Sequence, residues 1–439
     1  MPGLVAPPEP RPRGVPGRVA GRHLARLTVV TVVIGLLLGC GATQIPPVTG
    51  TSASGRSVTA SETAATQATL DAIGTAILRR DRPAYDALVS TRDPSFGVTA
   101  DMVYTNLTAM PLRTIVFRPG TRQQELAPAR RTLLGASAFV REVAVSWRVE
   151  GDHGLAEQLL WMTFVADGSA VTAAGTTDGP PERSAVPFWL VERLQVIRTA
   201  HTTTLAAATA GGRWPERGEA AARAVRRRLT GGLGARWDGR LVLEVPSTRQ
   251  AFERVLGVTP GSYAGIAAVA WPAGPDPATA AIRIVVNPGV TATLDEQGVS
   301  VLLVHEAVHV ATRSAASAAP TWLVEGFADY VAYDAYPTTA TTAAAALLRQ
   351  VKDRGAPASL PGDDQFAPSA PDLPLAYAQA WLACRLLAEE QSAARLMRFY
   401  LVASSGADVA VALQRETGLS TARLTAQWRR YLESAAARS

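Results

Sequence analysis

The chain has 439 residues, of which 47% are hydrophobic and 18% charged. This composition excludes a disordered protein and leaves room for two or three folded domains. The net charge is +6, but the excess is concentrated in the N-terminal arginines Arg11, Arg13, Arg18, Arg22 and Arg26. Because the remainder is close to neutral, we expect no nucleic-acid partner.

The first 40 residues have the pattern of an export signal. Basic residues precede an uncharged stretch, 27–38, which is shorter than the roughly 20 residues of a membrane-spanning helix. The stretch ends in Leu37-Leu38-Gly39-Cys40, which resembles the bacterial lipobox. We therefore expect a lipoprotein signal peptide (1–40), lipidation at Cys40, a flexible linker (41–60), and anchoring at the outer face of the cell membrane. An uncleaved anchor helix is the alternative.

Residues 61–210 are predicted to form an α+β domain. Apolar residues recur at helical spacing within 62–90, and a second short helix is expected at 102–110. Strand-like segments follow at 113–118, 139–149, 159–166 and 189–198. This order resembles the NTF2-like fold.

A polar stretch after Gly211-Gly212 places the expected domain boundary near residue 210. Residues 211–439 are predicted to form a small sheet followed by a helical bundle, so the whole chain is expected to be α+β. The expected elements are helices at 220–229 and 248–256, strands at 240–245, 263–271 and 281–287, and helices from 293 onward. Strand 281–287 is a candidate sheet edge for pairing with an extended peptide.

The segment His305-Glu306-Ala307-Val308-His309 carries a metal-binding pattern inside an apolar helical run. Residues four apart lie on one face of a helix, so both imidazoles can reach one ion. Glu306 lies about 100° around the helix and can contact a water on the ion without binding the ion. Thr293 and Glu296 fit a capping box at the start of this helix.

A second helix, expected to begin at Pro320, supplies the remaining ligand. Glu325 and Asp329 are four apart and share a face. Glu325 is predicted to complete a three-ligand zinc site, which leaves one position open. Asp329 is predicted to accept the free ring N–H of a ligand histidine and thereby to fix its tautomer.

These residues resemble the gluzincin zinc metallopeptidases, and peptidase MA-like domains in particular, over about 302–330. The resemblance implies His305, His309 and Glu325 as ligands of Zn²⁺, Glu306 as the catalytic base for peptide-bond hydrolysis, and Asp329 as the carboxylate behind them. It also suggests Tyr377 as an oxyanion donor, with core packing as the alternative. The metzincin pattern is excluded by Thr312 and Ala315, which stand where its glycine and third histidine would be.

Two other interpretations stay open at this point. The chain could be a catalytically silent binding or regulatory lipoprotein of peptidase fold, or its first domain could cover the active site. Of the remaining candidates, Cys384 is expected to be a small buried hydrophobe, His201 structural, and His153 solvent-exposed in a turn.

Overall fold

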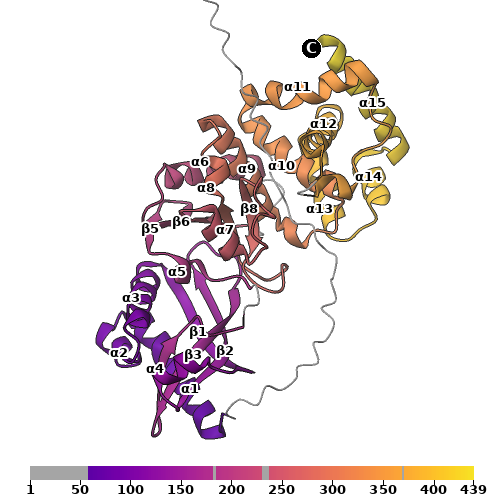
Figure 1. Cartoon of the computed structure of the whole chain (residues 1–439). Helices are drawn as coiled ribbons and strands as arrows, with labels where there is room; N and C mark the ends of the chain where they lie inside the picture. Colours follow the sequence, from indigo (N-terminus) through magenta and orange to yellow (C-terminus); the bar gives the residue numbers. More distant parts are fainter. Residues whose placement is uncertain (1–57, 181–183, 230–236, 368–369) are drawn as a thin grey trace, which may run out of the picture. The chain divides into compact units, whose positions relative to one another are not determined.

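The computed structural model describes residues 58–180, 184–229, 237–367 and 370–439. The predicted signal peptide, Cys40 and nearly all of the predicted linker lie outside these residues. Of the helices described, none is both long and apolar enough to cross a membrane. The fold is α+β, as predicted, with two separate sheets followed by helices that continue to the C-terminus (Figure 1).

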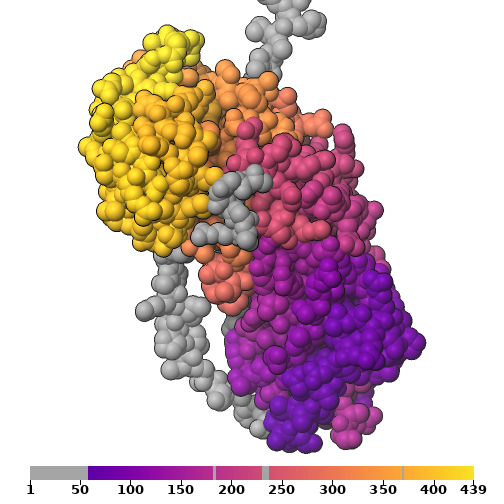
Figure 2. All heavy atoms as spheres, turned by 180° about the vertical axis from the view of Figure 1, so that it is seen from behind, coloured from indigo at the N-terminus to yellow at the C-terminus, as the bar shows by residue number. Residues whose placement is uncertain are grey.

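The first sheet is antiparallel, in the order β1-β2-β3-β4, and α1 packs against β1 and β4. The predicted helix at 62–90 is divided in two, because Asp81 caps a new helix that has Pro83 in its first turn. Figure 2 shows the side chains of this region, indigo to purple, gathered in one continuous stretch of surface. Its elements are α1 (Ala60–Arg79), α2 (Arg82–Asp86), α3 (Pro94–Ala109), β1 (Leu112–Gln124), α4 (Pro128–Leu134), β2 (Ala138–Val149), β3 (Ala156–Asp167) and β4 (Ala170–Gly175).

The second sheet has the strand order β5-β6-β7-β9-β8. Strands β6, β7 and β9 are parallel, whereas β5 and β8 run antiparallel to their neighbours. The elements of this region are α5 (Phe188–Val191), β5 (Leu194–Arg198), β6 (Thr202–Ala207), α6 (Trp214–Leu229), β7 (Leu241–Val245), α7 (Arg249–Leu256), β8 (Ala268–Pro272) and β9 (Ile282–Val286).

This sheet corrects two expectations. Strand β9 was the candidate edge, but it lies between β7 and β8, so the edge strands of this sheet are β5 and β8. Strands β5 and β6 precede residue 210, yet they belong to the second sheet because β6 pairs with β7. Strand order depends on pairing between distant segments, which hydrophobic periodicity does not report.

The remaining elements are helical, as predicted from residue 293 onward. Helix α9 begins after Asp295, whose carboxylate accepts the Gly298 N–H at 2.7 Å, and not at Thr293, whose hydroxyl instead donates to the Val290 carbonyl. The elements are α8 (Pro288–Thr291), α9 (Glu296–Thr312), η2 (Ser314–Ala316), α10 (Thr321–Ala335), α11 (Pro337–Arg354), η3 (Asp363–Phe366), α12 (Leu373–Gln391), α13 (Ala393–Ser404), α14 (Val409–Thr417) and α15 (Thr421–Arg438).

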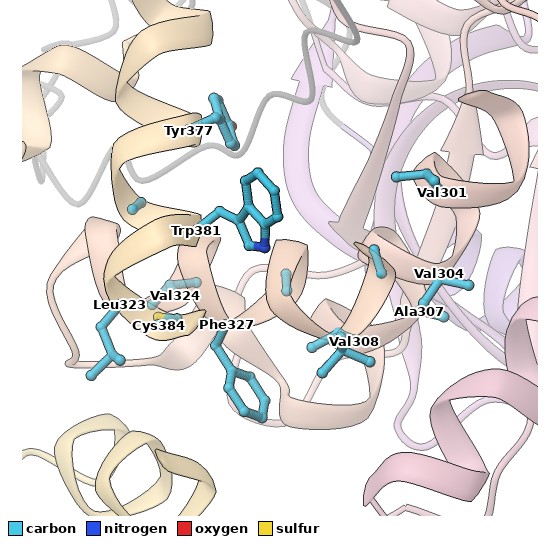
Figure 3. Packing of buried hydrophobic residues seen from close by; sticks show 14 of the residues in the cluster. Val301, Val304, Ala307, Val308, Leu323, Val324, Phe327, Tyr377, Trp381 and Cys384 are labelled. Carbon is cyan, nitrogen blue, oxygen red and sulfur yellow. The ribbon is translucent and has the colours of Figure 1, made fainter. Parts of the chain in front are cut away.

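Helices α10 and α12 pack unusually closely at Gly326. A Cβ atom at this position would lie 2.4 Å from the Ala380 carbonyl oxygen and 2.9 Å from the Cys384 Sγ. Only glycine therefore permits this approach without a shift of the backbone. Figure 3 shows the apolar packing around the contact, where Phe327 and Val324 of α10 and Cys384 of α12 lie among the buried side chains. Cys384 is fully buried, as predicted.

A buried ion cluster joins the turn after β2 to the second sheet. The Arg283 guanidinium, on β9, donates to both carboxylate oxygens of Asp152, at 3.2 and 2.8 Å, and to Glu244 on β7 at 2.9 Å. The same guanidinium lies 5.2 Å from the centre of the Trp147 ring. Nearby backbone bonds run from the Ala281 N–H to the Leu155 carbonyl and from the Glu157 N–H to the Ala273 carbonyl. These contacts link the two sheets within one compact unit.

Candidate metal centre

Helix α9 carries both predicted histidine ligands on one face. The Nε2 atoms of His305 and His309 are 2.7 Å apart, and their rings meet edge to face with centroids 4.5 Å apart. Both side chains are buried in the apolar core between α9 and its neighbours. The two imidazoles therefore direct their Nε2 atoms toward one point, as the i, i+4 spacing predicts.

Helix α10 brings Glu325 to the same point. Its Oε2 lies 3.2 Å from the His305 Nε2 and 3.5 Å from the His309 Nε2. The three potential ligand atoms all lie within 4.8 Å of one another. The structure therefore brings together the three residues that the sequence predicts as metal ligands.

The hydrogen bonding of this cluster fits a bound cation. Among the described residues, neither carboxylate oxygen of Glu325 has a hydrogen-bond partner, although Glu325 is fully buried. An unsatisfied buried acceptor costs about 1–3 kcal/mol, and more when it is charged. A metal ion between the three side chains would remove this cost. Two imidazoles and one carboxylate are a donor set typical of catalytic zinc, with a position left for water or substrate.

Asp329 lies behind His305, as predicted. Its Oδ1 is 2.8 Å from the His305 Nδ1, so it accepts the ring N–H and leaves the Nε2 lone pair directed at the ligand cluster. Burial disfavours the charged imidazolium, but the charge of Asp329 outweighs it and raises the pKa of His305 to about 10 in the metal-free site. Burial lowers the pKa of His309 to about 4.

Glu306 lies beside the ligand cluster and is not part of it. Its Oε2 accepts the Ala270 N–H of strand β8 at 2.7 Å, while its Oε1 has no hydrogen-bond partner among the described residues. Burial raises the pKa of Glu306 to about 8. The carboxylate is therefore held by one oxygen and offers the other, which is the arrangement that a general base needs.

No protein-family model matches the sequence, and no curated protein matches it either.

Tyr377 lies next to the ligand cluster. It is buried on α12, and its ring centroid is 6.2 Å from that of His305 and 5.4 Å from that of Phe366. Figure 3 shows Tyr377 and Trp381 projecting from the same side of α12. The structure thus places Tyr377 close enough to the cluster to be a candidate oxyanion donor, while its contact with Phe366 is ordinary core packing.

Two features of the site were not predicted from the sequence. One is the Ala270 N–H, because a backbone donor leaves no trace in residue types. The other is Gly326, which directly follows Glu325 and lets α10 approach α12. A glycine inside an apolar helix, next to a predicted ligand, is the pattern that could have indicated this close contact.

The other two described histidines lie away from the metal centre. The His201 Nδ1 is 2.7 Å from the Glu219 carboxylate, so His201 is structural, as predicted. His153 was expected to be exposed, but its side chain is 20% exposed and lies 2.9 Å from the Asp238 carboxylate. The turn around His153 packs against the second sheet, which explains the difference.

Proposed function

We infer that the protein is a zinc-dependent metallopeptidase of the gluzincin type, anchored by lipid at Cys40 to the outer face of the membrane. The observation that carries this inference is the convergence of His305, His309 and Glu325 around one buried point, with a second carboxylate, Glu306, held beside it. A purely structural cluster would not leave its own carboxylate oxygens unsatisfied.

The proposed residues have distinct roles. The two histidines and Glu325 would hold zinc, which would supply Lewis-acid polarisation of a scissile carbonyl and lower the pKa of a water molecule. Glu306 accepts the proton of the attacking water on Oε1 and delivers it to the leaving amine. The Ala270 N–H restrains the other oxygen of Glu306. Asp329 holds His305 in the tautomer that presents Nε2.

The sheet edge suggests how a peptide substrate would be oriented. Strand β8 is an edge strand of the second sheet, and its residue Ala270 contacts Glu306. An extended peptide added alongside β8 would run past the base, with its main chain oriented by backbone hydrogen bonds. Pro272 has no N–H, so this docking edge is confined to the residues before it.

The experiment compares the zinc content and peptide hydrolysis of the full-length protein with those of two variants. We expect about one zinc per chain in the wild type, none in His305→Ala, and an unchanged zinc content in Glu306→Gln. Because general-base catalysis contributes about 10²–10⁴-fold, Glu306→Gln should lose that factor in kcat against a peptide library while still binding zinc.

The two variants separate the possible outcomes. Zinc binding without hydrolysis of any library peptide by the wild type would favour the catalytically silent binding protein. Folded wild-type protein that takes up no zinc, even when zinc is added back, would contradict the metallopeptidase proposal altogether.

A further inference from the structure

A second site lies on the same helix as Glu325 and Asp329. Helices α10, α11, α12 and α15 enclose a cavity of about 590 Å³. This volume is within the range of small-molecule sites, roughly 300–1,000 Å³. The four helices are labelled in Figure 1 among the C-terminal elements. None of the proposed metal ligands lines this cavity, so it is distinct from the metal centre.

Aromatic rings dominate one part of the cavity. Tyr330, Tyr333, Trp381 and Tyr431 all line it, and the Tyr333 and Trp381 rings are 4.5 Å apart. The three tyrosines are half-buried, so each has a part of its surface available. Aromatic side chains combine a large apolar face with a polar group at one end, and they favour ligands that have both kinds of surface.

The charged groups that line the cavity are largely neutralised within the protein. Arg385 pairs with Glu389 at 2.7 Å and also lies over the Trp381 ring, while Asp334 pairs with Arg228. Arg438, at the end of α15, donates to the Ser434 hydroxyl and is the exception, because a hydroxyl does not neutralise its charge. The acids are therefore not available to hold a cationic ligand, and ion pairing is not the main attraction that this cavity offers.

Hydrogen-bonding groups, by contrast, are available. Within the described part of the chain, no hydrogen bond engages the hydroxyls of Tyr330, Tyr333 or Thr341, or the indole N–H of Trp381. Thr341 is exposed, but the other three groups are buried or half-buried, and such groups normally find a partner, from the protein, from water or from a ligand. The cavity thus combines apolar ring faces with several uncharged donors and acceptors.

We propose that this cavity binds a saccharide of one to three sugar units. A pyranose ring has an apolar C–H face that stacks on an aromatic ring and a rim of hydroxyls that bond to uncharged donors and acceptors. The three half-buried tyrosine rings supply the first surface, and the free hydroxyls and the indole N–H supply the second. The volume is sufficient for such a ligand. The proposal does not rest on the metallopeptidase function, because no metal ligand contributes to it.

The test measures binding of three neutral trisaccharides, maltotriose, cellotriose and N-acetylchitotriose, to the full-length protein by calorimetry and saturation-transfer NMR. At least one should bind. Tyr431→Ala removes a ring from the wall and should weaken binding about tenfold, which corresponds to roughly 1.4 kcal/mol. Ala340→Phe fills the cavity and should abolish binding, while zinc content stays unchanged.

Tyr336→Ala is the matched control, because Tyr336 is also half-buried but does not line the cavity. It should leave saccharide binding intact. Absence of binding by all three trisaccharides would overturn the proposal. So would binding that persists in Ala340→Phe, or a phenylalanine-containing tripeptide that occupies the cavity in place of the sugars. If zinc binding fails but saccharide binding follows this pattern, the metallopeptidase proposal alone is rejected.

Discussion

The protein contains two buried clusters of charged residues that differ in how completely their charges are compensated. Arg283 uses three of its nitrogens on Asp152 and Glu244, and none of the side-chain polar atoms of these three residues is both fully buried and without a hydrogen bond. In the cluster of His305, His309 and Glu325, both oxygens of Glu325 lack a hydrogen-bond partner among the described residues. The first cluster is paired within the chain, whereas the second leaves a carboxylate that an added cation could bind.

This difference separates a structural cluster from a candidate functional one. Burying a charge is costly unless a partner of opposite charge is provided at good geometry. The Arg283 cluster meets this condition from within the chain. In the candidate metal centre the Glu325 carboxylate lies 3.2 and 3.5 Å from the two imidazoles but forms no hydrogen bond, and two imidazoles and one carboxylate are the ligand types that zinc selects. Compensation, and not burial or charge alone, is thus the property that identifies the site.

The largest expected effect concerns the compensated cluster. Arg283→Met leaves Asp152 and Glu244 buried without their cation, and removal of one partner of a buried pair costs about 3–5 kcal/mol. The free energy of unfolding, measured in urea, should fall by this amount. The triple variant Arg283→Met, Asp152→Asn, Glu244→Gln should recover most of the loss. A single variant as stable as the wild type would show that the cluster is not a stabilising feature.

Added zinc should produce the next largest change in the free energy of unfolding. This change should require an intact metal centre. A ligand that binds only the folded state stabilises it by about 4 kcal/mol when its free concentration is roughly 1,000 times its Kd. Zinc should therefore raise the midpoint of urea unfolding of the wild type, and a chelator should reverse the change. His305→Ala is the control and should show no response. An equal response in wild type and control would place zinc elsewhere on the protein.

Gly326→Ala tests whether the close packing of α10 on α12 supports the metal centre. The added methyl meets the Ala380 carbonyl oxygen at 2.4 Å, and overpacking of this kind costs up to about 3 kcal/mol. The variant should lose stability and bind zinc more weakly, because Glu325 is the preceding residue. Gly97→Ala, on α3, is the matched control, since no atom lies within 4 Å of its added Cβ. It should be neutral or slightly stabilising.

The smallest expected effect is on the dependence of stability on pH. A hydrogen bond from Ser95, with support from Arg130, lowers the pKa of Asp93 from 3.8 to about 2. Because the pKa is lower in the folded state, the stabilisation is present above pH 4 and is lost as the pH falls toward 2. The shift corresponds to about 2 kcal/mol. Asp93→Asn keeps the helix cap but should flatten this part of the stability curve. Identical curves for the two proteins would assign acid sensitivity to other groups.

The proposed metal ligands were predictable because they depend on the spacing of residues within a single helix. Helical spacing alone places His305 with His309 and Glu325 with Asp329, and in the structure His305, His309 and Glu325 converge on one point while Asp329 lies at the Nδ1 of His305. The α+β class followed from the order of periodic segments. The predicted ends of the elements were less accurate. Asp295 and not Thr293 caps α9. Either side chain can cap a helix, and only the path of the backbone decides between them.

Features that depend on distant pairing were not predictable. The place of β9 inside the sheet and the membership of β5 and β6 follow from strand pairing, for which periodicity carries no information. The Arg283 cluster was also missed, since Asp152 is 131 positions away in the sequence. A lone arginine within the apolar segment Ile282-Arg283-Ile284 was the available indication that a buried partner exists.

The packing at Gly326 also provides a built-in chemical reporter. Cys384 is fully buried against this contact, and burial raises the pKa of its thiol, so alkylating reagents in solution cannot reach a reactive thiolate. Separation of α10 and α12 at Gly326 would uncover the thiol. The rate at which native protein takes up a small alkylating reagent at Cys384, read by mass spectrometry, therefore measures how often the helix that carries Glu325 detaches from its support.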